Sequence, residues 1–410
     1  MKKFFALLLS LAMGLALVAC GQKDPTPDTP DTPDDPQTKV EYKVAMITDY
    51  GDITDQSFNQ TTYEACKAFA EDNSIEFSYF KPAGDNTADR VAMIEKAVDE
   101  GFNVIVMPGY AFGGAIVEAA PEFPDVKFIA LDVAAGDLLE TAVAKAGEAY
   151  DYTPKNWDLN KYVDMSNVYC AVYQEELCGY MAGYAAVKLG YKNLGFLGGM
   201  SVPAVVRYGY GFVQGVDAAA ADLGLTDVKL NYIYGGQFFG DADITAVMDT
   251  WYQGGTEVVF ACGGGIYTSA VDAAKKVGAK VIGVDVDQAG VIAKYAGVDG
   301  MTVTSAMKGL YPATYDTLTD VIVNGNWDKY VGKIATLGLV SGTDPEANYV
   351  QIPMGDGTQW SDSFTQDDYK AMVKDMFDGK ITVSNNTSSD VSAADFATVI
   401  TVDDQGSIKG

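Results

Sequence analysis

The chain has 410 residues, a formal net charge of −28 at pH 7 and no histidine. This excess of acidic side chains argues against nucleic acid or anionic lipid as a partner, and it suits a neutral or cationic ligand. The absence of histidine removes the commonest general base and the commonest metal ligand, so we expect no catalytic residues, no metal and no cofactor.

The first twenty residues predict an export signal. Lys2 and Lys3 precede an apolar run at 4–18, which is typical of a signal peptide and too short for a comfortable transmembrane span. The run ends in Leu-Val-Ala-Cys-Gly, which resembles the bacterial lipobox. This resemblance implies removal of residues 1–19 and acylation of Cys20, so that several acyl chains anchor the protein to the extracytoplasmic face of the cell membrane. An ordinary signal peptide with a chance cysteine is the alternative.

Proline and aspartate dominate the next segment. No aliphatic or aromatic residue occurs at 22–38, so this stretch cannot bury enough apolar surface to offset the entropy lost on ordering. Proline and charge repulsion keep such a chain extended. We therefore predict a disordered tether at 20–39 that holds a globular body off the membrane. The body has about 370 residues, which is large for one core and favours two lobes.

Short apolar runs alternate with helical stretches through this body. The alternation predicts parallel sheets covered by helices on both faces, and two consecutive sets predict two doubly wound lobes. The predicted strands are 43–48, 76–80, 104–107, 127–131 and 167–173, followed by 194–197, 230–234, 258–261 and 281–284. The predicted helices are 59–72, 88–100, 175–188, 203–222, 241–252 and 266–277.

The remaining cysteines lack the CxxC spacing of a redox or zinc site. They are Cys66, Cys170, Cys178 and Cys262, and two of them lie in strand-like apolar runs. We therefore predict buried free thiols and no disulfides.

Three of the predicted strands are followed directly by an aspartate, namely Asp49, Asp132 and Asp285. A single aspartate in such a place is more often a helix cap or a turn former. In open parallel sheets, however, ligands bind beyond the carboxyl ends of the strands. Three carboxylates at equivalent strand ends therefore predict one ligand crevice.

A glycine run raises a competing interpretation. Gly263, Gly264 and Gly265 follow a predicted strand and open a helix, and Asp285 ends the next strand. This pattern matches half of a dinucleotide fingerprint, in which glycines approach a pyrophosphate and an acid holds the ribose diol. The sixth position holds Thr268 instead of glycine, which disfavours a dinucleotide site. Asp285 is still well placed to accept two hydrogen bonds from ribose hydroxyls.

Residues 49–60, Asp-Tyr-Gly-Asp-Ile-Thr-Asp-Gln-Ser-Phe-Asn-Gln, resemble the opening signature of the basic membrane protein family. These lipoproteins include the purine nucleoside receptor A proteins, which are substrate-binding subunits of ABC importers. The likeness covers about residues 40 to 330, and little of it remains after Gly342. Its other motifs are 123–128 with Asp132, 174–183, 198–203, 211–212, 283–288, and Ser305 with Lys308.

The resemblance implies a type I periplasmic-binding-protein fold of the α/β class. Two doubly wound parallel-sheet lobes, joined by a hinge, close over a ligand without catalysis. The N-terminal lobe is predicted to contain 40–173 and about 309–330, and the C-terminal lobe 174–308 and about 331–383. Residues 384–410 are predicted to form a polar extension.

The resemblance also implies roles for individual residues. In nucleoside-binding members, aromatic rings sandwich the base, polar groups hold its edge, and carboxylates with a lysine hold the ribose. Carried over by motif, the base-edge residues are Asp49 and Asn59, and the stacking residues are Phe58 and Tyr208, with Tyr210 as the alternative to Tyr208. The ribose residues are Asp132, Asp285 and Lys308, with Asp287 as the alternative to Asp285, and Gly263, Gly264 and Gly265 allow close approach of the backbone.

These features predict a monomeric substrate-binding lipoprotein that captures a nucleoside, with a purine expected, and delivers it to an ABC permease with its ATPase. Several aspartates and one lysine leave no excess of positive charge for a phosphate, which favours a nucleoside over a nucleotide. The alternatives are a binding protein for a free sugar or another small polar metabolite, and a surface receptor or adhesin. A nucleoside hydrolase would need an Asp-rich metal cluster, which is not evident in the sequence.

Overall fold

The computed structural model describes residues 41–409. The predicted signal peptide, the lipidation site Cys20 and the predicted tether lie outside the described residues. Between residues 41 and 409, no helix combines the length and apolar character needed to cross a membrane.

The first sheet contains six parallel strands in the order β11-β5-β4-β3-β1-β2. Its strands are β1 (Lys43–Ile47), β2 (Glu76–Phe80), β3 (Val104–Pro108), β4 (Lys127–Leu131), β5 (Val168–Tyr173) and β11 (Lys333–Leu337). Every residue of β3 is buried. Strands of this kind, rich in Val, Ile and Met and covered on both faces, are typical of parallel sheets.

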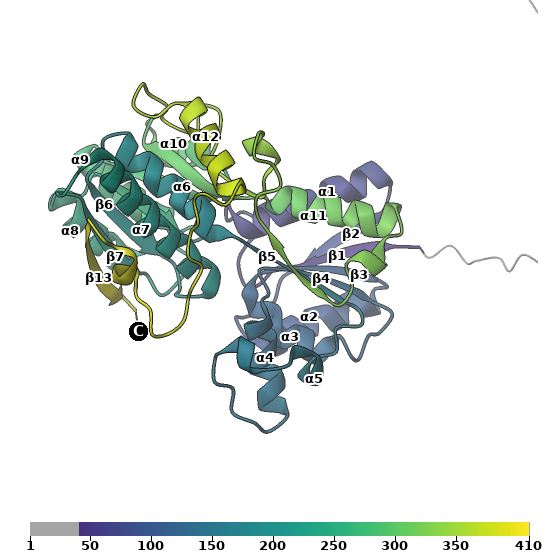
Figure 1. Cartoon of the computed structure of the whole chain (residues 1–410). Coiled ribbons are helices and arrows are strands. Elements are labelled where there is room, and N and C mark those ends of the chain that lie inside the picture. The colour runs from purple at the N-terminus through teal and green to yellow at the C-terminus, as the bar shows by residue number, and fades with distance from the viewer. Residues whose placement is uncertain (1–40, 410) are drawn as a thin grey trace, which may run out of the picture. The chain divides into compact units, whose positions relative to one another are not determined.

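Helices cover both faces of this sheet. They are α1 (Phe58–Asn73), α2 (Thr87–Asp99), α3 (Gly113–Ala119), α4 (Ala135–Lys145), α5 (Leu159–Tyr162) and α11 (Leu310–Leu318). Val44 and Met46 share a core with α1 and α11, whereas Ala45 and Ile47 share a core with α2, α3 and α4. Because side chains alternate along a strand, one apolar strand supplies both cores. Figure 1 shows α1 beside α11, with α2, α3 and α4 across the sheet from them.

The second sheet has the order β12-β10-β9-β8-β6-β7-β13. Its strands are β6 (Asn193–Gly198), β7 (Lys229–Tyr234), β8 (Val258–Cys262), β9 (Lys280–Asp285), β10 (Thr302–Lys308), β12 (Val350–Gln351) and β13 (Thr401–Ser407). All neighbours pair in parallel except β12, which runs antiparallel to β10.

Helices also cover both faces of the second sheet. They are α6 (Glu175–Lys188), α7 (Pro203–Leu223) and α12 (Gln366–Phe377) on one face, and α8 (Ala242–Gln253), α9 (Tyr267–Val277) and α10 (Ala289–Ala296) on the other. Short helical turns lie at Tyr110–Phe112, Pro154–Asn156, Thr319–Val323, Trp327–Lys329, Pro345–Ala347 and Ala393–Phe396.

Glycines bring α6 and α7 into unusually close contact. A Cβ atom on Gly211 of α7 would lie 2.1 Å from the carbonyl oxygen of Glu176, and one on Gly179 of α6 would lie 2.3 Å from the carbonyl oxygen of Tyr208. Only glycine permits such an approach of two helix backbones. The close packing holds the first turns of α6 and α7, which carry charged residues of the site, in fixed register.

The chain passes between the two sheets three times: from β5 to α6, from β10 to α11, and from β11 to β12. Within each sheet the strand order reverses once, between β1 and β3 and between β6 and β8. These features are those of the type I periplasmic-binding-protein fold with two doubly wound lobes, as predicted. All nine predicted strands are confirmed to within one residue at each end.

Two segments differ from the sequence prediction. Lys333–Leu337, assigned to the C-terminal lobe, is β11 and pairs with β5 in the first sheet. Thr401–Ser407, assigned to a polar extension, is β13 and pairs with β7. Both lie at sheet edges, where one side of a strand faces solvent and the apolar pattern is weak. The four cysteines in the described residues are buried and free, which confirms that prediction.

Candidate functional site

A cavity of about 470 Å³ lies between the carboxyl ends of the two sheets. Loops that follow β1 to β4 line one side of it, and loops that follow β6 to β9, with the end of β10, line the other. Its volume is within the range of small-molecule binding sites, and it lies where ligands bind in open α/β sheets. All ten residues predicted to bind ligand line this cavity: Asp49, Phe58, Asn59, Asp132, Tyr208, Gly263, Gly264, Gly265, Asp285 and Lys308.

Asp49 is held by the loop that follows β1. Its Oδ1 accepts hydrogen bonds from the backbone N–H groups of Tyr50 at 2.6 Å and Gly51 at 2.7 Å, and from Asn59 Nδ2 at 3.1 Å. The second oxygen, Oδ2, lies on the side of Gly109 and accepts no hydrogen bond from the described residues. One oxygen therefore fixes the carboxylate, and the other is available to a ligand.

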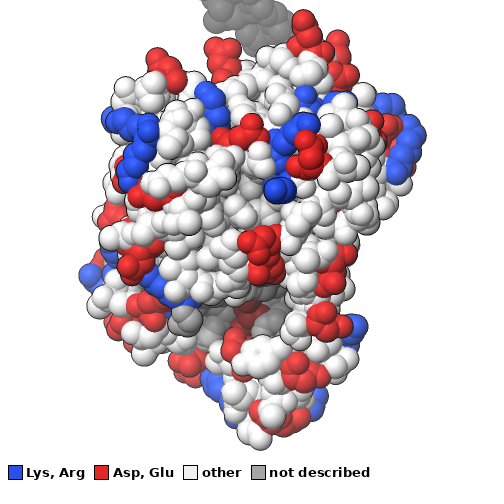
Figure 2. Space-filling model, turned by 90° about the vertical axis from the view of Figure 1, so that its left-hand side faces the viewer, with Lys and Arg blue, Asp and Glu red and all other residues white. Residues whose placement is uncertain are grey.

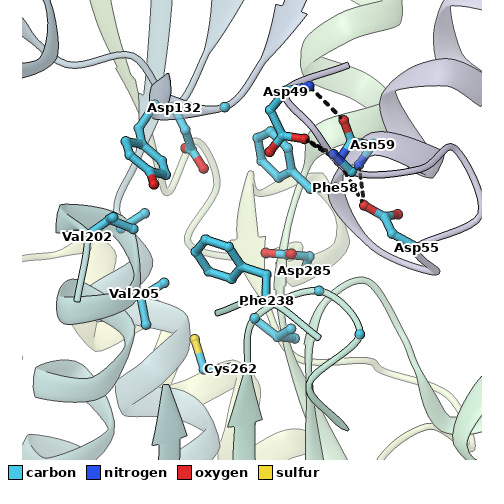
Figure 3. Close-up of a pocket in the computed structure, with 18 of the residues that line it drawn as sticks. Asp49, Asp55, Phe58, Asn59, Asp132, Val202, Val205, Phe238, Cys262 and Asp285 are labelled. Carbon is cyan, nitrogen blue, oxygen red and sulfur yellow. Dashed lines mark hydrogen bonds between the residues drawn. The ribbon is translucent and has the colours of Figure 1, made fainter. Parts of the chain in front are cut away.

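Asn59, the second residue of α1, hydrogen-bonds to this loop. Its Nδ2 also donates to Asp55 Oδ2 at 3.1 Å, and its Oδ1 accepts from the backbone N–H of Asp49 at 3.4 Å (Figure 3). Asp55 in turn accepts from the backbone N–H groups of Ser57, Asn59 and Gln60 and so caps the start of α1. The amide predicted to hold a base edge is thus occupied in positioning Asp49.

Asp132 and Asp285 face each other across the site from opposite sheets. Both have backbone φ angles in the left-handed region, 60° and 65°, which residues other than glycine rarely adopt. Strained conformations of this kind concentrate at functional sites. Asp285 Oδ1 accepts from the Tyr208 hydroxyl at 3.2 Å, and the Ser57 hydroxyl of the opposite lobe donates to Oδ2.

The structure separates the two pairs of alternatives left open by the sequence. Asp285 lines the cavity, whereas Asp287 is exposed and accepts from the backbone N–H of Ala289 at 3.0 Å. Tyr208 lines the cavity, whereas Tyr210 points away and donates its hydroxyl to the Val391 carbonyl at 2.9 Å. Asp285 and Tyr208 remain the candidates.

Lys308 lies at the centre of a buried charge cluster. Its Nζ is 2.5 Å from Asp132 Oδ2, 3.5 Å from Glu175 Oε1 and 3.6 Å from Asp285 Oδ1. Arg207 adds a second cation, because its Nε donates to Glu175 Oε2 at 2.7 Å. Sequence reasoning missed Glu175 and Arg207 as members of the site. Glu175 stands in the matched motif at 174–183, so the motif itself was the available signal.

Burial controls the protonation of these groups. It raises the pKa of Asp132 to about 6, because lost solvation outweighs the attraction of Lys308. It also raises the pKa of Asp137, another cavity residue, to about 7. Burial opposes the charge on Lys308, but the attraction of its carboxylate neighbours prevails and raises its pKa above the ordinary value. Asp132 Oδ1 is buried and has no hydrogen-bond partner among the described residues, which leaves an acceptor for a ligand hydroxyl.

Two phenylalanines supply the apolar walls. The rings of Phe58 and Phe238 point into the same space beside Asp132 and Asp285 (Figure 3). Phe238 lies in the loop between β7 and α8 and was missed by sequence reasoning. Cβ atoms on Gly199 and Gly263 would lie 2.4 and 2.8 Å from its Cδ1 atom. Gly263 therefore makes room for the Phe238 ring and also lines the cavity.

The cavity lining carries more acidic than basic side chains. The cavity lining contains six aspartates against Lys81, Arg207 and Lys308. On the face shown in Figure 2, acidic and basic side chains are interspersed and gather in no large patch of either sign. The cavity wall is thus net negative, which disfavours a phosphate group and suits a neutral or cationic ligand.

The chain is similar to substrate-binding and solute-binding proteins of ABC transporters. A family described as "ABC transporter substrate-binding protein PnrA-like" matches residues 42–345. The "ABC transporter nucleoside-binding protein BmpA" of Lactococcus lactis subsp. cremoris is 25% identical over 389 residues, covering 92% of this chain and 96% of that protein. "Basic membrane protein B" of Borreliella burgdorferi is 25% identical over 322 residues, covering 76% of this chain and 83% of that protein. A solute-binding protein structure from Aeropyrum pernix superimposes with a TM-score of 0.63 at 18% identity, covering 85% and 95% of the two chains.

Proposed function

This chain belongs to the PnrA-like family of ABC transporter substrate-binding proteins. We therefore propose that it captures a nucleoside between its two lobes, and we expect a purine nucleoside. It then delivers the nucleoside to an ABC permease driven by an ATPase. The function is binding and transport, with no chemical step. A relative that spans nearly the same length is named as nucleoside-binding, which supports this ligand class.

The carrying observation is that charged and aromatic side chains meet in one cavity, where Lys308 Nζ lies 4.7 Å from the centroid of the Phe58 ring. Asp132, Asp285 and Lys308 meet in this cavity, and charged hydrogen-bonding groups of this kind suit the vicinal hydroxyls of a ribose. Phe58 and Phe238 form the apolar part, where a planar base would stack. Asp49 Oδ2 stands ready to accept from a base amino or ring N–H group.

The electrostatics of the cavity narrow the ligand class. Six aspartates against three cations repel a phosphate, so a nucleoside is favoured over a nucleotide. A free sugar would use the carboxylates and the lysine but would leave much of the aromatic wall uncovered. The two phenylalanines therefore favour a nucleoside over a sugar.

Localisation follows from the N-terminal motif. We propose a monomer at the extracytoplasmic face of the cell membrane, anchored through acylated Cys20 with residues 20–39 as the tether. The apolar run at 4–18 and the Pro/Asp-rich segment support it. Acylation of two groups on one cysteine gives lasting attachment, which keeps the binding lobes near the permease.

The direct test is a thermal-shift screen of the purified protein against nucleosides, nucleotides and free sugars, joined to mass spectrometry of any ligand that co-purifies. A nucleoside at ~100 times its Kd should add about 2.7 kcal/mol to the free energy of unfolding. Nucleotides with the same base should give a smaller shift. A response to a pentose or hexose, with none to any nucleoside, would overturn the assignment.

A further inference from the structure

The segment at 384–409, called the strap below, packs along the second lobe and ends at the loop that carries the cavity residue Phe238. It first follows α7, where the Tyr210 hydroxyl donates to the Val391 carbonyl at 2.9 Å. Asp217 of α7 then accepts from the backbone N–H groups of Thr398 at 2.8 Å and Val399 at 2.8 Å. The segment finally forms β13 at the edge of the second sheet, next to β7 (Figure 1). It lies beyond residues 42–345, which the family comparison matches.

The residues after β13 contact the loop that carries Phe238. This loop, residues 235–241, connects β7 to α8. The backbone N–H of Ile408 donates to the Tyr234 carbonyl at 2.8 Å, just before the loop. Lys409 Nζ donates to Gln237 Oε1 at 2.8 Å and forms an ion pair with Asp241. Lys409 thus contacts Gln237 within the loop and Asp241 at the end of the loop.

Hydrogen bonds within the loop connect the residues that Lys409 contacts to Phe238 and its neighbours. Gln237 Nε2 donates to the Phe239 carbonyl at 2.9 Å and to Asp241 Oδ2 at 2.9 Å. The Phe238 carbonyl accepts from the backbone N–H of Gly265 at 2.9 Å on the other side. Phe238 is therefore held between the loop's own hydrogen bonds and the glycines against which its ring packs.

We propose that residues 401–409 position the 235–241 loop, with Lys409 as the positioning residue, and thereby hold Phe238 in the cavity wall. A loop with few buried contacts opens easily, and the contacts of Ile408 and Lys409 add a restraint to the loop's own hydrogen bonds. Lys409 touches no ligand; it acts on affinity through Phe238. The effect on nucleoside affinity rests on the proposed function, whereas the effect on the loop does not.

The test compares Lys409→Met with Lys380→Met in the full chain. Both remove one positive charge, but the ion pairs of Lys380 with Asp375 and Asp378 are exposed and lie far along the chain from the 235–241 loop. Hydrogen exchange of the 235–241 amides is measured without ligand, and adenosine affinity is measured by calorimetry. Lys409→Met should speed loop exchange and raise the Kd about fivefold, the size of one partly exposed charged contact. Lys409→Arg should restore both, and Lys380→Met should change neither.

Each outcome decides the proposal. Unchanged loop exchange in Lys409→Met overturns it, and so does faster exchange with wild-type adenosine affinity. Equal effects of Lys380→Met also overturn it, because they would trace the change to net charge. If the wild-type protein binds neither adenosine nor another nucleoside, the proposed function fails, and loop exchange alone then decides whether the strap holds the loop.

Discussion

Removing the cation at the centre of the site should leave buried carboxylates without compensation. Lys308 is 4% exposed and lies within 3.6 Å of oxygen atoms on Asp132, Glu175 and Asp285. Lys308→Met keeps the apolar stem and deletes the charge, and Arg207 then remains as the cation paired with Glu175. Breaking a buried ion pair on one side costs about 3–5 kcal/mol. We expect Lys308→Met to lower the free energy of unfolding by this amount at pH 7.

The pH dependence gives the sharper signature. The pKa of Asp132, raised to about 6 by burial, exceeds its ordinary value of 3.8, so the folded state binds more protons than the unfolded state between these values. Stability from this group is therefore present at low pH and is lost as pH rises toward 6. Deleting Lys308 removes an attraction that lowers this pKa, so the window moves upward. The deficit of Lys308→Met should be smaller at pH 5 than at pH 7.

The assay is chemical denaturation of wild type and variant at both pH values, followed by far-UV circular dichroism. Lys380→Met serves as the matched control, because an exposed pair contributes about 0–1 kcal/mol. A deficit of under about 1 kcal/mol for Lys308→Met at pH 7 would contradict the buried-charge argument. If Lys308→Met loses the same free energy of unfolding at pH 5 and at pH 7, the titration of Asp132 does not contribute to the loss, which would refute the expected pH dependence.

Three further predictions concern other parts of the chain. Asp285→Asn should weaken nucleoside binding about tenfold or more, since charged hydrogen bonds contribute about 1.5–3 kcal/mol. Asp287→Asn is the control and should bind like wild type in calorimetry. The reverse pattern would assign the ribose contact to Asp287. Gly211→Ala should lower stability by about 1–3 kcal/mol through a clash with α6, whereas Gly355→Ala, with open space around it, should leave Tm nearly unchanged. Cys20→Ala should abolish labelling by a fatty-acid probe, and equal labelling of both proteins would exclude the anchor.

Much of the fold was readable from the sequence because strand signals are local. Runs such as 104–107 are apolar at every position, which is typical of a strand covered on both faces. In parallel sheets all carboxyl ends lie on one edge, so Asp49, Asp132 and Asp285 could be expected at one crevice without knowledge of the packing. The weakly patterned edge strands β11 and β13 carried no comparable signal, because their pairing depends on where distant segments leave room.

Finer features of the site were decided only by tertiary structure. Tyr208 and Tyr210 are chemically alike, but two residues along a helix turn a side chain by roughly 200°, so one faces the cavity and the other the strap. Nothing local marks Phe238 as a wall residue, since its place depends on Gly199 and Gly263 from other loops.

The sequence by itself determined the nine strands from β1 to β9 and the residue types that gather at their ends, because both follow from hydrophobic periodicity and chain direction. The hydrogen-bond partners of those residues were decided by tertiary structure. Asn59 turns its amide to Asp49 and Asp55, and Lys308 becomes the cation of a cluster that joins two lobes. Such partnerships depend on distances between segments far apart in the chain, which no local pattern records.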